Sequence, residues 1–181
     1  MTDKKVKATE TKAAPKKAEH ETCLSGNRLV SKTHGRIAFR GRIDLLEADV
    51  IEAQVLALQL GADGACGSLG EILGYLRSLM AAEVRETPLA PPALFGMDAE
   101  ELHRRSHDPK GTFALPSCAQ GPLAARINTL RAKVRETELL AVKVFGPGAA
   151  ETAEREDIIL ALNRLSSALW WLFCKHTAER S

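Results

Sequence analysis

The sequence has few aromatic side chains, almost no net charge and no closely spaced cysteines. Aromatic residues make up 4% of its 181 residues, and the formal net charge is +2. A chain with so little net charge is poorly suited to binding nucleic acid, which requires a basic surface. The four cysteines are too far apart in sequence to form a paired metal motif: Cys23, Cys66, Cys118 and Cys174. The sequence therefore predicts no nucleic-acid partner and no structural or redox metal.

Long apolar runs are also missing. The first residues contain no apolar segment of the kind found in secretory signal peptides, and we expect no stretch long and apolar enough to cross a bilayer. These absences favour a cytoplasmic protein with reduced thiols and no membrane partner. Residues 1–24 hold six lysines mixed with acids and small residues. That composition predicts a disordered tail rather than a binding arm.

Helix-forming residues are abundant in the rest of the chain, residues 25–181. Ala, Leu, Glu and Arg recur throughout, whereas alternating β-branched runs are scarce. Residues 28–41 and 107–122 are predicted loops because they contain glycine or proline and lack a helical pattern. Short connections between successive helices favour an all-α five-helix bundle in one domain. Apolar periodicity predicts its helices at about 42–60, 67–86, 99–106, 123–145 and 153–176.

The stretch "INTLRAKVRETE" in the fourth predicted helix aligns three charges. Arg131, Arg135 and Glu138 are spaced i, i+4 and i+7, so they share one stripe. Two adjacent guanidinium groups repel each other unless an anion lies between them, and a polyphosphate suits such a pair. A solvated helix face is the simpler interpretation of this helix taken alone. The apolar residues of the segment are predicted to form another stripe: Ile127, Leu130, Val134 and Leu139.

The fifth predicted helix contains an asparagine that favours a functional site. Asn163 shares a face with Ser167 and Trp170, apart from the apolar stripe of the helix. Asparagine is unfavourable within a helix and normally needs a partner there. Asn163 is therefore either a structural hydrogen-bonding residue or one that binds the edge of a nucleotide. His103 and His107 have a spacing that suits a metal, but without an evident third ligand we favour ordinary hydrogen bonding.

Four short motifs follow one another along the chain. Lys32 begins a segment "KTHGRI" with Asp44 seven residues after its end, and "FALP" occupies 113–116. The pattern "R-x-x-x-R-x-x-E" occupies 131–138, and "LNRLS" occupies 162–166. In this order they resemble motifs of the ATP:corrinoid adenosyltransferases of the propanediol- and ethanolamine-utilisation type. The segments "ELHRRSHDP", "RAKVRETE" and "ALNRLSS" look most like the ethanolamine branch, and the resemblance covers roughly residues 28–176.

This resemblance implies a homotrimer that binds ATP between neighbouring subunits and holds cobalamin beside it. Asp44 would form a salt bridge with Arg131 across the subunit interface. Phe113 and Leu115 would contact the corrinoid. The implied ATP-binding residues are Lys32, Arg131, Arg135, Glu138 and Asn163.

The implied reaction transfers the 5′-deoxyadenosyl group of ATP to cobalt and releases triphosphate. Co(I) itself attacks the C5′ carbon, so the protein needs no nucleophile. Phe113 would fill the lower axial position of Co(II) and ease its reduction, whereas Arg135 and Mg²⁺ would stabilise the departing triphosphate. These are the two residues to which the resemblance gives a catalytic role.

Two other interpretations stay open from the sequence. One is a non-catalytic corrinoid-binding escort or sensor on the same fold, and the other is a plain helical scaffold in which the aligned charges have no purpose. The triphosphate-binding pattern favours the enzyme, since an escort does not need it. A reductase and an adenosylcobalamin-dependent enzyme are the further partners that the chemistry suggests. Association with a microcompartment is left open.

Overall fold

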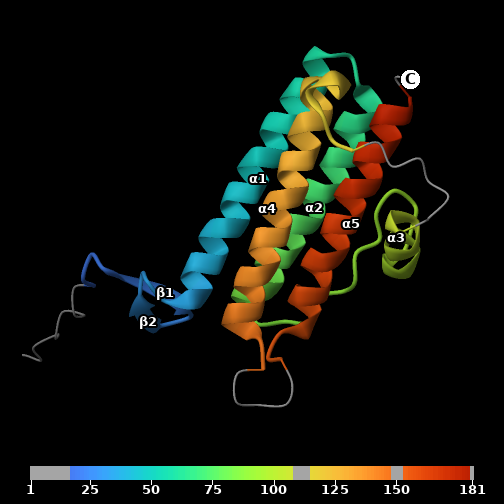
Figure 1. Cartoon of the computed structure of the whole chain (residues 1–181). Helices are drawn as coiled ribbons and strands as arrows, with labels where there is room; N and C mark the ends of the chain where they lie inside the picture. The colour runs from blue at the N-terminus through green and yellow to red at the C-terminus, as the bar shows by residue number, and fades with distance from the viewer. Residues whose placement is uncertain (1–16, 108–114, 148–152, 180–181) are drawn as a thin grey trace, which may run out of the picture.

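Four long helices lie side by side in the computed structural model, which describes residues 17–107, 115–147 and 153–179 (Figure 1). A short helix, α3 (Ala99–Ser106), packs against α5 on the outside of this bundle. For the described residues, the predicted all-α five-helix fold is confirmed. The long helices are α1 (Gly35–Gln59), α2 (Asp63–Arg85), α4 (Gly121–Phe145) and α5 (Glu156–Ala178).

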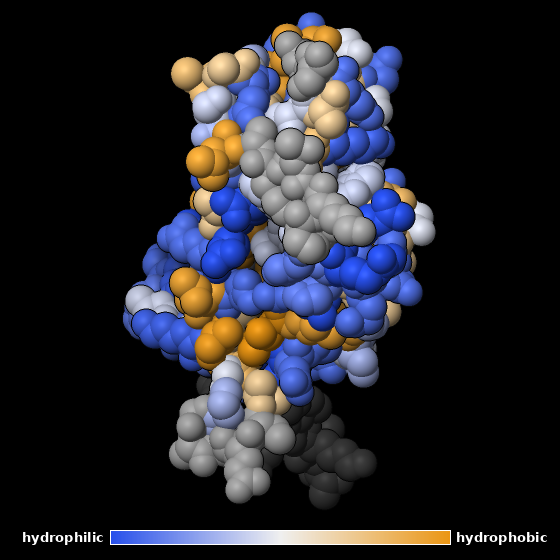
Figure 2. All heavy atoms as spheres, turned by 45° about the vertical axis from the view of Figure 1, so that its right-hand side comes forward, coloured by the Kyte–Doolittle hydropathy of each residue, from blue (hydrophilic) through white to orange (hydrophobic). Residues whose placement is uncertain are grey.

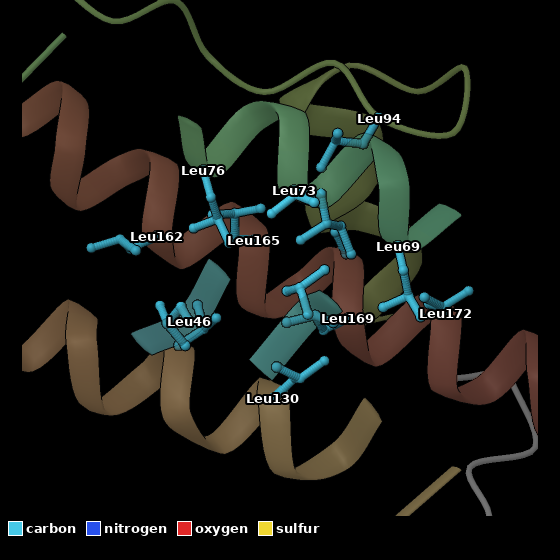
Figure 3. Close-up of a cluster of buried hydrophobic side chains, with 14 of the residues drawn as sticks. Leu46, Leu69, Leu73, Leu76, Leu94, Leu130, Leu162, Leu165, Leu169 and Leu172 are labelled. Atoms are coloured by element: carbon cyan, nitrogen blue, oxygen red, sulfur yellow. The ribbon is translucent and has the colours of Figure 1, made fainter. Parts of the chain in front are cut away.

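A leucine-rich core holds the helices together. Helix α1 packs against α2 and α4, while α5 packs against α2, α3 and α4. Figure 3 shows leucines from several helices meeting in this core, among them Leu76 of α2, Leu130 of α4 and Leu169 of α5. Each of the three is at most 1% exposed. Burial of one such side chain contributes roughly 1.5–3 kcal/mol, so this shared core fixes α4 beside α5.

Helix α1 begins well before its predicted start. Its first residue is Gly35, and the His34 ring Nδ1 caps it by accepting a hydrogen bond from the Arg36 backbone N–H at 3.2 Å. The buried stripe of the helix continues upstream through Arg36 and Phe39. The prediction of a loop as far as Gly41 is therefore wrong. A glycine costs a helix only about 1 kcal/mol, which packing of the buried stripe offsets.

An antiparallel hairpin precedes α1. Strand β1 (Glu21–Ser25) pairs with β2 (Arg28–Ser31). The turn uses Gly26 at φ +52°, a left-handed conformation that glycine adopts without strain. Leu24 is 3% exposed and ties β1 to the rest of the molecule. The prediction of a disordered tail is therefore wrong for this strand, while residues 1–16 lie outside the described part of the chain.

The later helices fall close to their predicted ranges. Helix α3 coincides with its predicted bounds, and the Asp98 side chain caps it by accepting a hydrogen bond from the Glu101 N–H at 2.8 Å. A single 3₁₀ turn, η1 (Cys118–Gln120), leads into α4 from the predicted loop. The apolar stripe predicted for α4 is wrong at its end, because Leu139 is 71% exposed. The helix buries Thr137 there instead.

The expectation that no segment could span a bilayer is wrong for α5 by length and composition. Its most apolar window has a mean hydropathy of 1.2, which is enough for a candidate span. However, 50% of that window is buried inside the molecule. The helix packs against three others, so its apolar character matches that of a bundle core helix. Figure 2 shows the side of the molecule on which α3 and α5 lie, where hydrophobic side chains form separate patches among hydrophilic ones.

Candidate functional site

The two aligned arginines of α4 face α5 and share one pocket. Arg131 and Arg135 line a cavity of about 360 Å³ at the junction of α3, α4, α5 and the segment before η1. Because they are four residues apart on one helix, their side chains lie one turn from each other. The other lining residues are Ser106, His107, Leu115, Pro116, Ser166, Ser167 and Trp170. The spacing of the arginines predicted their common location, whereas Ser106 gave no comparable signal in the sequence and His107 was expected only to form hydrogen bonds.

Neither arginine forms an ion pair with a carboxylate of the described residues. Arg131 donates a hydrogen bond from Nε to the neutral Asn128 Oδ1 at 3.1 Å. Its guanidinium carbon lies 5.3 Å from the centre of the Trp170 ring. By contrast, Arg126 on the same helix forms ion pairs with carboxylates of α1. The pocket therefore contains two cationic side chains whose charge the described carboxylates leave uncompensated.

The electrostatics of the pocket favour an anion. Burial, and then the nearby positive charge of Arg135, hold the pKa of Arg131 below its ordinary value. An arginine remains protonated despite such a shift, so the Arg131 cation stays charged although burial and Arg135 both disfavour its charge. A bound polyanion would remove this repulsion and accept hydrogen bonds from both guanidinium groups.

Glu138 and Asn163 are brought together, although neither lines the arginine pocket. The Asn163 Nδ2 donates to the Glu138 Oε1 at 3.0 Å, and the Asn163 Oδ1 accepts from the Arg164 Nη1 at 2.8 Å. Arg164 also pairs with Glu100 at 3.2 Å. This network joins α4, α5 and α3, which gives Asn163 the structural partner that a mid-helix asparagine needs. Their contact with a nucleotide stays a prediction.

The structure locates only one of the two residues that were predicted to contact the corrinoid. Leu115 lines the pocket and is 86% exposed, so an apolar side chain is available there to a ligand. Pro116 adds to the same wall. Phe113 lies outside the described residues, and its contact with cobalamin stays a prediction.

Lys32 and Asp44 lie apart from the arginine pocket of their own chain. Lys32 is exposed in the turn between β2 and α1, and Asp44 is exposed on α1. Neither lines the pocket, and within the described part of the chain no ion pair joins Asp44 to Arg131. One chain alone therefore does not bring all the predicted ATP ligands together.

A second cavity of about 580 Å³ lies between the hairpin and the adjoining ends of α1 and α4. Its cationic lining residues are Arg28, Arg36 and Lys143. Sequence reasoning missed this cavity because it did not predict the hairpin that forms one wall. The turn signal at Gly26 was the only clue to that wall.

His103 of α3 and His107, the residue that follows the helix, both form hydrogen bonds, as expected: the His103 Nδ1 lies 3.4 Å from the Arg164 Nη1. The His107 Nδ1 lies 2.9 Å from the His103 carbonyl oxygen and 2.9 Å from the Ser106 Oγ. Across the residues that the structure describes, no cluster of three or more His, Cys, Asp or Glu side chains could hold a metal ion. The absence of a resident metal from the whole protein stays a prediction.

Comparison with known proteins gives a consistent result. The family model described as "Cobalamin adenosyltransferase" matches residues 14–176. The chain is 36% identical over 168 residues to the corrinoid adenosyltransferase EutT of Salmonella typhimurium, covering 91% of this chain and 61% of that protein. It is 36% identical over 159 residues to the EutT of Escherichia coli K12, covering 86% of this chain and 58% of that protein. The chain thus spans less than two thirds of the length of either relative.

Proposed function

This chain belongs to the cobalamin adenosyltransferase family, and from that premise we propose that it transfers the 5′-deoxyadenosyl group of ATP to the cobalt of reduced cobalamin, releasing triphosphate. The observation that carries the proposal is the pair Arg131 and Arg135, which share a pocket without a described carboxylate partner. A cationic pocket of this kind suits the triphosphate of ATP better than a neutral ligand.

The arginines would act on the leaving group. In the proposed reaction a Co–C bond forms at C5′ of ATP while the C5′–O bond breaks, and the bonding electrons leave with triphosphate. Negative charge therefore builds up on the phosphate chain in the transition state, where guanidinium groups held in a partly buried pocket stabilise it. Arg131 is held beside Trp170 and Asn128, so little reorganisation is needed when this charge develops.

Mg²⁺ would enter with the nucleotide. The described residues contain no cluster of acids or histidines able to hold a metal by themselves. Mg²⁺ is commonly bound by substrate phosphates, water and at most one or two carboxylates. In that position it would neutralise part of the triphosphate charge and assist its departure.

The apolar wall of the pocket supports a corrinoid beside the triphosphate. Leu115, Pro116 and Trp170 line the same cavity as the arginines. A flat, largely apolar macrocycle suits such a wall, while the polar side of the pocket holds phosphate. Phe113 precedes Leu115 by two residues, and its proposed role is to fill the lower axial position of Co(II).

We also propose that the protein works as a homotrimer. On α1, Asp44, Ile51, Val55 and Leu58 are spaced so that they share one face. All four are exposed, and the three apolar side chains are 44%, 49% and 59% exposed, respectively. An apolar stripe on a helix normally packs against another element. A neighbouring subunit there would bring its Arg131 to Asp44 and would place Lys32 of one chain near the arginines of another.

The direct test is an anaerobic assay. Purified protein, MgATP and chemically reduced cobalamin are mixed, and the absorbance of the Co–C bond of adenosylcobalamin is followed together with triphosphate release. The two products should form in equal amounts. Binding of corrinoid without either product would favour the alternative, a non-catalytic escort or sensor. Cytoplasmic localisation and a dependence on a separate reductase remain part of the proposal.

A further inference from the structure

Trp170 forms the wall of the pocket against which Arg131 lies. The guanidinium carbon of Arg131 is 5.3 Å from the centre of the Trp170 ring. The indole is stacked on Phe173, with ring centres 5.3 Å apart and planes at 14°. Phe173 is 1% exposed, so the core supports the indole from behind. Trp170 is therefore a rigid surface rather than a freely rotating side chain.

Arg131 needs such a surface for an electrostatic reason. Burial and the charge of Arg135 both act against its guanidinium cation. A carboxylate would relieve this cost, as Glu100 does for Arg164 on α5. However, a carboxylate would also compete with a phosphate for the same N–H donors. The face of an indole attracts a cation through its quadrupole without accepting hydrogen bonds from its N–H groups. The Arg131 Nε donates to Asn128, and the indole leaves the Nη donors clear of a carboxylate.

We propose that Trp170 is a positioning residue for the triphosphate: it holds Arg131 in place as a cation while leaving its Nη hydrogen-bond donors available to phosphate oxygens. This inference rests on the proposed function and deepens it. Trp170 acts through Arg131, so its loss lowers affinity for the polyphosphate part of the substrate. Because an aromatic face is what matters, phenylalanine replaces it in part and leucine does not.

The adjacent Trp171 provides a matched control. Its ring stacks on Phe95 with centres 5.1 Å apart, and the Lys175 Nζ lies 5.3 Å from its ring centre. It therefore has the same residue type, a similar stacking partner and a similar cation contact as Trp170. Unlike Trp170, it does not line the arginine pocket.

The experiment measures binding of inorganic tripolyphosphate to the full chain by calorimetry. Trp170→Leu should bind roughly tenfold more weakly than the wild type, and Trp170→Phe should stay within about threefold. Trp171→Leu should stay within about twofold, since it leaves the pocket intact. Circular dichroism checks that each variant is folded. In turnover, Trp170→Leu should raise the KM for ATP more than it lowers kcat.

Fluorescence gives a second measurement that does not depend on the stability of Trp170→Leu. The chain contains two tryptophans, so Trp171→Phe leaves Trp170 as the only indole. Saturation with tripolyphosphate should change the emission of Trp170, because bound phosphate changes the electrostatic environment of the Arg131 cation that lies over the indole ring. The same addition to Trp170→Phe, whose only indole is Trp171, should leave emission unchanged.

The outcomes separate the inference from the proposed function. If the wild type binds tripolyphosphate and Trp170→Leu binds it equally well, the positioning role is wrong and the proposed function is untouched. Equal losses in Trp170→Leu and Trp171→Leu, or unchanged emission from Trp170, also overturn the role. Tripolyphosphate binding with the expected losses but without adenosylation would overturn only the proposed function. A wild type that does not bind tripolyphosphate contradicts both.

Discussion

Two pairs of arginines in this molecule, each spaced four residues apart on a helix, have opposite surroundings. On α1, Arg36 and Arg40 converge on Glu83 of α2, which is 0% exposed. The Arg36 Nε donates to the Glu83 Oε1 at 2.5 Å, and the Arg36 Nη2 donates to the Glu83 carbonyl oxygen at 2.9 Å. On α4, Arg131 and Arg135 face a pocket and have no ion pair with a described carboxylate.

The difference shows that burial of an arginine is not itself a sign of function. Burial acts to lower the pKa of Arg36, but the hydrogen bonds that it donates to Glu83 and Glu86 outweigh burial and raise that pKa. For Arg131, burial and then Arg135 lower the pKa. Carboxylates of α2 neutralise the first pair within the fold, whereas no described carboxylate neutralises the second pair. Mutations at the α1 pair should therefore lower the stability of the fold, whereas mutations at the α4 pair should weaken binding of the triphosphate.

The largest expected effect is the loss of folding stability when Glu83 is replaced. Glu83→Gln leaves Arg36 and Arg40 without their shared buried carboxylate, and breaking a buried pair in this way costs roughly 3–5 kcal/mol. The free energy of unfolding, measured by urea denaturation, should fall by about that amount. A loss of less than about 1 kcal/mol would mean that the α1–α2 pair is not structural, because surface changes produce shifts of that size or smaller.

Arg135→Ala should give the reverse pattern. Arg135 is exposed and unpaired among the described carboxylates, so its removal should change the free energy of unfolding by no more than about 0.5 kcal/mol. The rate constant kcat/KM for ATP should fall roughly 10²-fold, as when a group that stabilises transition-state charge is removed. Anaerobic kinetics with Co(I) give this value. An unchanged kcat/KM would remove Arg135 from the catalytic site.

In the proposed trimer, Asp44 of a neighbouring subunit would supply the carboxylate that Arg131 does not find among the described residues of its own chain. Val55 of α1 is 49% exposed on the proposed interface, and Val84 of α2 is 41% exposed. Val55→Glu should dissociate the trimer in sedimentation velocity, whereas Val84→Glu, which introduces the same charge on another helix, should not. The same mass for both variants and for the wild type would contradict the interface on α1.

The smallest expected effect is a difference between Glu86→Gln and the wild type in how far acid lowers the melting temperature. Hydrogen bonding from Arg36, followed by the charge of that residue, lowers the pKa of Glu86 in the folded protein. Because the folded pKa lies below the unfolded one, the contribution of Glu86 is complete above its unfolded pKa. It is lost as pH falls through the folded pKa. As the pH falls below about 4.3, the melting temperature should therefore decrease less for Glu86→Gln than for the wild type. Parallel plots of melting temperature against pH for the two proteins would exclude the effect.

The sequence predicted α3 and the common location of Arg131 and Arg135, for identifiable reasons. Asp98 is a strong cap, and the charged stripe of α4 follows directly from helical spacing. It did not predict that the Asn163 amide is bound to both Glu138 and Arg164, because that network depends on how three helices pack. The lining residues Ser106 and His107 were missed for the same reason.

The N-terminal region shows how composition can mislead. Lysines made residues 1–24 look like a tail, and glycines made the next segment look like a loop. The informative features were local: Gly26 at a hairpin turn and the buried Leu24 before it. Such a short hairpin gains its stability by packing on the bundle, and that packing cannot be inferred from its own residues.

We propose that arginines without a carboxylate partner among the described residues, and not arginines in general, hold the triphosphate. The most direct measurement is calorimetric titration of tripolyphosphate into Arg131→Gln and Arg126→Gln. Both arginines lie on α4, but Arg126 pairs with Asp49, which keeps Lys133 as a second partner. We expect binding to weaken by at least about tenfold in Arg131→Gln, the loss typical of one charge-assisted hydrogen bond, and to stay unchanged in Arg126→Gln. Equal losses in the two variants, or none in Arg131→Gln, would contradict the claim.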